Sequence, residues 1–251
     1  MNDSVKTLEL IAHRGASWDA PENTVSAVRL AWEQGADAVE ADFRLTRDGQ
    51  IVAIHDDSTL RIAGVDLRVR EHSLDELQAL DFGSWKSDRF RGERIATLDQ
   101  LLATMPAGKR FYVEIKCGAE IAGPLAASVR QVGLADERIV VICFSSAVLV
   151  QVRRALPKSP TYLVVEFLRD PQSGAWFPDA EAMLSEAVRT ELTGLDLMAA
   201  RLDSGLVARA KEAGLDLCVW TVDSPEEARR TLDLDIHRIT TNRPGWLREQ
   251  L

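Results

Sequence analysis

Residues 38–45 read AVEADFRL, and this short stretch indicates how the chain folds. Its apolar residues Val39, Ala41 and Phe43 alternate with the acidic Glu40 and Asp42, which is the period of two of a β-strand. Comparable short runs, rich in apolar and β-branched residues, recur along the chain and are separated by stretches with the periodicity of amphipathic helices. The runs span residues 8–13, 38–45, 111–116, 138–144, 161–166, 194–199, 217–222 and 237–241.

Strands that alternate with helices favour a parallel sheet, and eight such strands close a (β/α)8 barrel. We therefore predict an α/β protein, a (β/α)8 TIM barrel in which residues 1–251 form a single domain. The length agrees, because closed α/β barrels of about 250 residues routinely fold as one domain. An open, doubly wound sheet is the alternative, but no Gly-rich phosphate loop follows the first run, residues 8–13.

One segment departs from this alternation. After the second strand, Asp48-Gly49 is a signal for a two-residue hairpin loop, and residues 50–55 resume a strand. The two strands must be antiparallel, because a parallel crossover needs a dozen residues or more. We predict an additional β-hairpin after strand 2, followed by a small excursion around residues 56–100.

The hairpin also predicts a register. A two-residue loop pairs Arg47 with Gln50 and, further along the ladder, Asp42 with His55, so that His55 shares the face of Asp42. A longer, bulged loop would shift this register.

Composition excludes several classes of function. Apolar residues make up 46% of the chain and charged residues 27%, and 30 basic against 39 acidic residues give a net charge of −9. A broad face for nucleic acid is therefore not expected. No apolar stretch is long enough for stable membrane insertion, and the N-terminus lacks the basic and apolar regions of a signal peptide. We expect a cytoplasmic protein; the sequence does not indicate its oligomeric state.

The active sites of such barrels lie at the C-terminal ends of the strands. There, Glu40 and Asp42 share one strand face, and Glu114 and Lys116 share another, so three carboxylates and a lysine point into the barrel. Carboxylates gathered in a low-dielectric place cost several kcal/mol per uncompensated ion. An ion-pair network with Lys116 and Arg14, or a divalent cation with oxygen ligands, would compensate them.

Two histidines favour a catalytic site. His13 ends the first strand and His55 ends the returning arm of the hairpin. Beside the acidic residues and the cations Arg14 and Lys116, they offer a general acid, a general base and fixed positive charge for an anionic transition state. This combination suits phosphodiester cleavage.

Several blocks of the sequence then carry a specific resemblance. They are HRGAS (13–17), APENT (20–24), GADAVEAD (35–42), LTRDG (45–49), HD (55–56), EIK (114–116), VWTV (219–222) and TNRP (241–244). Together and in this order, from about Leu8 to Trp246, they resemble the glycerophosphodiester phosphodiesterase family. The stretch DSTLRIAG (57–64) differs from the usual turn of that family, which bears on substrate choice.

The resemblance implies a phospholipase-C-like barrel with one divalent cation, Mg or Ca. Its small-molecule substrate would be a glycerophosphodiester, hydrolysed to glycerol 3-phosphate and an alcohol. A lysophospholipid-cleaving phosphodiesterase on the same scaffold and a non-catalytic phosphodiester-binding barrel are the alternatives. The implied roles are acid/base catalysis for His13 and His55 (His13 the base), metal binding for Glu40, Asp42 and Glu114, substrate binding for Arg14, Lys116 and Trp220, and support for Glu22.

Overall fold

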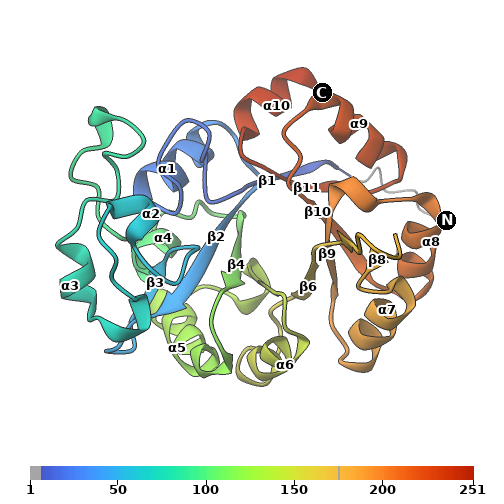
Figure 1. Cartoon of the computed structure of the whole chain (residues 1–251), viewed down its shortest axis with the longest axis horizontal. Coiled ribbons are helices and arrows are strands. Elements are labelled where there is room, and N and C mark those ends of the chain that lie inside the picture. The colour runs from blue at the N-terminus through green and yellow to red at the C-terminus, as the bar shows by residue number, and fades with distance from the viewer. Residues whose placement is uncertain (1–6, 175) are drawn as a thin grey trace.

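All eight predicted strands are present in the computed structural model, which describes residues 7–174 and 176–251. They form a parallel barrel that closes because the first strand pairs with both the second and the last. The predicted TIM barrel is therefore confirmed (Figure 1). Residues 1–6 of the N-terminus, where we expect no signal peptide, lie outside the described residues. The barrel strands are β1 (Glu9–Ala12), β2 (Ala38–Leu45), β4 (Arg110–Ile115), β5 (Ile139–Cys143), β6 (Thr161–Val165), β9 (Gly194–Met198), β10 (Asp216–Trp220) and β11 (Arg238–Thr241).

Helices surround the barrel, as the ring of coiled ribbons in Figure 1 shows. Most begin at a side-chain cap, for example Thr24, Ser145 and Ser224, whose hydroxyl oxygens accept backbone N–H groups of the first turn. No helix in the described ranges is long and apolar enough to cross a membrane. The α-helices around the barrel are α1 (Val25–Glu33), α4 (Leu98–Leu102), α5 (Ala122–Val132), α6 (Ser146–Ala155), α7 (Ala180–Arg189), α8 (Ser204–Glu212), α9 (Pro225–Asp233) and α10 (Pro244–Gln250). Single 3₁₀ turns lie at η3 (Ala119–Ile121), η4 (Asp136–Arg138) and η5 (Ala199–Arg201).

The strand period of two separates two cores. Val39, Ala41 and Phe43 of β2 face outward and belong to the large core between barrel and helices. A smaller core fills the barrel interior with Ile11, Tyr112, Val140, Ile142, Tyr162, Val164 and Cys218. Because this interior is packed, a site on the barrel lies at the ends of its strands and not inside it.

The extra strand β3 (Ile51–Ala53) lies outside the barrel and pairs antiparallel with β2, but the predicted register is wrong. Leu45 pairs with Ile51 and Phe43 with Ala53, one residue away from the two-residue-loop register. The reason is a longer turn, in which Thr46 Oγ1 accepts the Gln50 N–H at 2.9 Å and Gly49 adopts a φ of 76°. The turn therefore has the form of a three-residue hairpin loop that ends in a left-handed glycine.

The excursion after β3 builds its own small core. It holds the short helices α2 (Leu60–Ala63) and α3 (Leu74–Gln78) and the 3₁₀ turns η1 (Val69–Glu71) and η2 (Asp88–Phe90). Its apolar cluster contains Val52, Ile54, Ile62, Val69, Leu77, Phe82 and Ile95. Two of these residues, Val52 of β3 and Ile54 just after it, pack against the excursion. The excursion therefore fixes the path of the backbone after β3.

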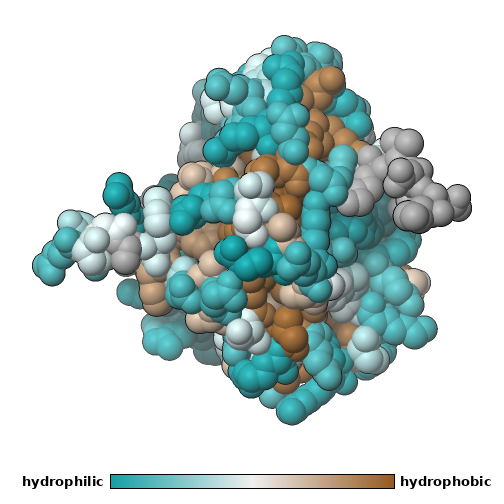
Figure 2. Space-filling model, turned by 90° about the vertical axis from the view of Figure 1, so that its right-hand side faces the viewer, coloured by the Kyte–Doolittle hydropathy of each residue, from teal (hydrophilic) through white to brown (hydrophobic). Residues whose placement is uncertain are grey.

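A second hairpin, between β6 and α7, has no counterpart in the sequence prediction. Its strands β7 (Leu168–Arg169) and β8 (Trp176–Phe177) have two residues each, too few to show a period of two. The hairpin projects from the body of the molecule as the arm at the left of Figure 2.

Candidate active site

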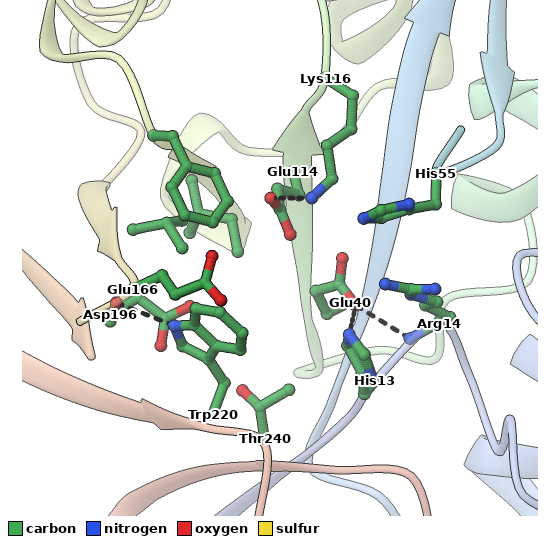
Figure 3. Close-up of a pocket in the computed structure, with 13 residues that line it drawn as sticks. His13, Arg14, Glu40, His55, Glu114, Lys116, Glu166, Asp196, Trp220 and Thr240 are labelled. Carbon is green, nitrogen blue, oxygen red and sulfur yellow. Dashed lines mark hydrogen bonds and ion pairs between the residues drawn. The ribbon is translucent and has the colours of Figure 1, made fainter. Parts of the chain in front are cut away.

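A cavity of about 390 Å³ opens at the C-terminal ends of the barrel strands. Seven of the nine sequence-predicted site residues line it, and Figure 3 shows them converging on one space. The other two, Asp42 and Glu22, lie behind this lining and contact it through Arg14. The lining residues are His13, Arg14, Glu40, His55, Glu114, Lys116, Ile142, Phe144, Val164, Glu166, Asp196, Trp220 and Thr240.

The turn after β1 places the first two site residues. Arg14 adopts a left-handed φ of 56° and Gly15 a φ of 80°. A Cβ on Gly15 would lie 2.6 Å from the carbonyl carbon of Ala27, so only glycine fits. This turn directs the Arg14 N–H to Glu40 Oε2, at 2.9 Å. A non-glycine residue in this region is uncommon, and such strain tends to occur at functional sites.

The guanidinium of Arg14 binds the acids behind the cavity. Its Nε lies 3.0 Å from Asp42 Oδ2, and its Nη1 donates to Glu22 Oε1 at 2.9 Å. Glu22 also accepts two hydrogen bonds from Arg61 of the excursion. The sequence assigned Glu22 a supporting position, and the structure places it beside Arg14.

Three carboxylates form a buried cluster at the end of β2 and β4. Asp42 and Glu114 are register partners on these neighbouring strands, and one ligand atom from each of Glu40, Asp42 and Glu114 lies within 4.8 Å of the others. Glu40 Oε1 accepts no hydrogen bond from any described residue. Asp42 Oδ1 lies 3.3 Å from Lys116 Nζ, which also forms an ion pair with Glu114 Oε1. Several carboxylate oxygens gathered within reach of one point are the ligands that Mg²⁺ and Ca²⁺ prefer.

The pKa values of this cluster indicate unbalanced negative charge. Burial, together with the charge of Asp42, raises the pKa of Glu40 well above its usual value and that of Glu114 to about 7. Burial also acts to raise the pKa of Asp42, but the charges of Arg14 and Lys116 outweigh it and hold that pKa below the usual value. The ion-pair network that the sequence analysis offered as one alternative is present, yet the two basic side chains leave the three carboxylates with one uncompensated negative charge. The residues present fit a divalent cation.

His13 is held by an amide. Its Nδ1 lies 2.8 Å from Asn242 Oδ1, while its Nε2 lies 4.0 Å from Glu40 Oε2. Burial and the charge of Arg14 lower the pKa of His13 to about 4, so the ring is neutral at pH 7. A neutral ring with one nitrogen directed at the acidic cluster can accept a proton.

His55 reaches the same cavity by a different route from the predicted one. The Ile54 N–H donates to the Asp42 carbonyl at 2.9 Å, which puts Ile54, not His55, opposite Asp42. Beyond that bond, Arg44 of β2 donates through Nε (3.0 Å) and Nη2 (2.8 Å) to the His55 carbonyl. The ring points into the cavity (Figure 3), and its Nδ1 lies 2.8 Å from Asp56 Oδ1.

The wall opposite the histidines is aromatic and acidic (Figure 3). Trp220 lines the cavity as predicted, donates its Nε1–H to the Asp196 carbonyl at 3.1 Å, and packs edge-on against Phe144 at 6.1 Å between ring centres. The ring of Phe144 also lies 5.3 Å from Lys116 Nζ. Glu166, at the end of β6, completes this wall.

Sequence reasoning missed several polar residues of the site. Asn23 donates to Asp42 Oδ2 at 2.9 Å and accepts the Asp42 N–H at 3.0 Å. Asp223 accepts from Asn242 Nδ2 at 2.5 Å. Asp196 is buried, and burial raises its pKa to about 7. A signal for Asp196 was present, because it alternates with Leu195 and Leu197 of the outer core and so faces inward.

A TIM barrel with an acidic cluster, two histidines and two basic side chains at the C-terminal ends of its strands has the features of a phosphodiester hydrolase. Comparison with known proteins gives the family. Residues 13–246 match the glycerophosphoryl diester phosphodiesterase family, to which the chain belongs.

Relatives and solved structures agree with this membership. The chain is 32% identical over 250 residues to a glycerophosphodiester phosphodiesterase of Caldanaerobacter subterraneus, with 97% of each chain covered. It superposes with a TM-score of 0.81 and 25% identity on an Oleispira antarctica phosphodiesterase solved in complex with the product sn-glycerol-3-phosphate, covering 96% of each chain. A glycerophosphodiester phosphodiesterase from Agrobacterium tumefaciens gives a TM-score of 0.80 and 26% identity, covering 96% of this chain and 99% of that one. The protein is an enzyme of this family that hydrolyses glycerophosphodiesters.

Proposed function

We propose that the enzyme is metal-dependent and that His13 and His55 supply acid/base catalysis as it releases glycerol 3-phosphate and an alcohol. One observation carries the proposal: Glu40 and Glu114 line the same cavity as both histidines, and Asp42 completes an acidic cluster with them directly behind the cavity wall. The Oleispira relative, solved with sn-glycerol-3-phosphate, supports this product. We further propose that residues 1–251 form a single barrel domain that carries both the catalytic and the substrate-binding residues.

Glu40, Asp42 and Glu114 would hold one divalent cation, Mg or Ca. When bound, the cation would polarise the phosphoryl oxygens and offset negative charge in the transition state. Arg14 and Lys116, which line the cavity and contact Asp42 behind it, would orient the phosphate. Trp220 would contribute an apolar face for the glycerol carbons.

We assign the general base to His13. Its Nδ1 is held by Asn242 and its pKa of about 4 keeps the ring neutral, so Nε2 is free to take a proton. That proton would come from water or from the neighbouring hydroxyl of the substrate. His55 would be the acid that protonates the leaving alkoxide, because its ring lines the opposite side of the acidic cluster from His13 and is held in place by the contact of Nδ1 with Asp56 Oδ1 at 2.8 Å.

A release assay tests the proposal. Glycerol 3-phosphate should appear from glycerophosphocholine and glycerophosphoethanolamine, stop in excess chelator and return with Mg²⁺ or Ca²⁺. Full turnover in chelator, with no metal by elemental analysis, would remove the metal from the proposal. Tight binding of the diester without any release would instead favour the non-catalytic barrel.

A leaving-group series tests the division between the histidines. A substrate whose alcohol has a low pKa needs little acid assistance, so it should rescue His55→Ala but not His13→Ala. Rescue of His13→Ala alone would reverse the assignment. Equal rescue of both variants would contradict any division of roles.

A cytoplasmic location belongs to this proposal as well and rests on the sequence alone.

A further inference from the structure

A second hollow, of about 390 Å³, adjoins the catalytic cavity at the mouth of the barrel. It runs between the end of β6 and α7 and passes the β7–β8 hairpin. Phe144, Val164 and Glu166 line both hollows, so the two are continuous. We call the second one the side groove; Phe177, Pro178, Ala182 and Met183 are among its lining residues.

The side groove is apolar and open. Phe177 is 70% exposed and Phe144 47%, although both are large aromatic side chains. The charged residues that line it are Glu166, at its junction with the cavity, and Glu186, which binds Ser146 and Arg189. A contiguous apolar surface left exposed next to a polar catalytic cavity marks a place where apolar ligand surface binds.

We propose that the side groove binds the acyl chain of a monoacyl glycerophosphodiester, a lysophospholipid, whose phosphate occupies the catalytic cavity. The inference rests on the proposed function, because binding of the phosphate in the catalytic cavity positions the glycerol and therefore the acyl chain esterified to it. Continuity through Phe144 and Val164 gives an apolar path from the cavity into the groove. The geometry therefore extends the substrate class from small glycerophosphodiesters to diesters with an apolar tail.

The length of the substrate's acyl chain is the variable that tests this proposal directly. The substrates are 1-acyl-glycerophosphocholines with hexanoyl, octanoyl and decanoyl chains, kept below the concentration at which they aggregate, with glycerophosphocholine as reference and choline release as the readout. We expect kcat/KM to rise about twofold per methylene, less than the roughly fourfold (about 0.8 kcal/mol) of full burial, because the groove is open on one side.

Two variants address the groove itself. Phe177→Ser removes an exposed wall, and Ala182→Trp fills the groove from the surface of α7. Both should flatten the chain-length dependence and leave glycerophosphocholine turnover unchanged. Val188→Ser is the matched control, since Val188 is an exposed apolar residue of the same helix that does not line the groove. It should keep the wild-type dependence.

A binding measurement separates this inference from the proposed function. In a His13→Ala background, calorimetry should give Kd values that fall with acyl length, whatever that variant does to turnover. Kd and kcat/KM values that do not change with chain length would overturn the inference, even if glycerophosphocholine is hydrolysed. An effect of Phe177→Ser that is confined to substrate in lipid vesicles would also overturn it, because the residue would then contact a lipid surface rather than a chain in the groove.

Discussion

His13 Nδ1 lies 2.8 Å from the Oδ1 atom of Asn242, and the orientation of that amide is fixed by a third residue. Asn242 Nδ2 points at the carboxylate of Asp223, 2.5 Å away, which can only accept. The amide oxygen must therefore face His13, so Nδ1 carries the hydrogen and Nε2 has the lone pair. The same oxygen also accepts the hydroxyl of Ser17, at 2.8 Å.

This relationship makes Asn242 a positioning residue. Asn242→Ala should lower kcat by about 10- to 100-fold, the range for residues that orient a functional imidazole, with little change in KM. Because the hydrogen on Nδ1 loses its acceptor, ¹⁵N NMR should show His13 in a mixture of tautomers. Ser17→Ala is the control: it removes the other donor to the same oxygen and should change kcat less than about threefold. A single Nδ1–H tautomer in Asn242→Ala, with normal kcat, would contradict the argument.

Cation binding should release protons. The pKa of Glu114 is raised to about 7 and that of Glu40 is also raised, mainly by burial, so the metal-free cluster holds protons that a cation must displace. Affinity for Mg²⁺ or Ca²⁺ should therefore rise as pH increases from 6 to 8. Calorimetric titrations in two buffers of different ionisation enthalpy measure the number of protons released. A pH-independent affinity without proton release would show that the carboxylates are already ionised.

The acidic cluster should be essential while other glutamates are not. Glu40→Gln and Glu114→Gln each remove a charged ligand, so activity should fall by about 100-fold or more, and stabilisation by Ca²⁺ in thermal unfolding should disappear. Glu249→Gln is the control, because Glu249 is exposed on α10 and should behave as wild type. Loss of activity with an unchanged Ca²⁺ effect on unfolding would place the cation elsewhere.

The strand period made much of this site predictable. Glu40, Asp42 and Glu114 face inward because they alternate with core residues, and the same rule could have found Asp196. Strand periodicity does not predict the register of the β2–β3 hairpin, because the register depends on the length of the turn. That turn is one residue longer than predicted and contains a side-chain hydrogen bond from the Gln50 N–H to Thr46 Oγ1. His55 still reaches the cavity, because contacts distant in sequence guide the chain beyond β3.

The left-handed glycine of the hairpin turn gives a stability prediction. Gly49 has a φ of 76°, so Gly49→Ala should lower the free energy of unfolding by about 1 kcal/mol, the cost of a left-handed conformation. Asn adopts the left-handed conformation more readily than other non-glycine residues, so Gly49→Asn should lower the free energy of unfolding by less than Gly49→Ala. Urea unfolding measures both. A gain from Gly49→Ala would show that residue 49 is not held in the left-handed region.

The buried carboxyl of Asp196 has a pKa of about 7 in the folded chain, against 3.8 as the ordinary value. Burial causes this rise, because it disfavours the charged form. Between pH 4 and 7 the folded state therefore holds a proton that the unfolded state has lost, and stability falls as pH rises through this range and then levels off.

Asp196→Asn keeps the shape of the neutral acid but cannot ionise. Its free energy of unfolding should be close to that of wild type near pH 4 and exceed it at pH 8 by on the order of 2–4 kcal/mol, because each tenfold change in an ionisation constant corresponds to about 1.4 kcal/mol. Urea unfolding in chelator, at intervals from pH 4 to 8, measures the difference without a contribution from bound cation. Asp75→Asn, at an exposed aspartate of α3, should give a curve parallel to wild type. If the Asp196→Asn curve is also parallel to wild type, Asp196 ionises alike in both states, and the carboxyl at the base of the cavity is not the neutral acid that its burial requires.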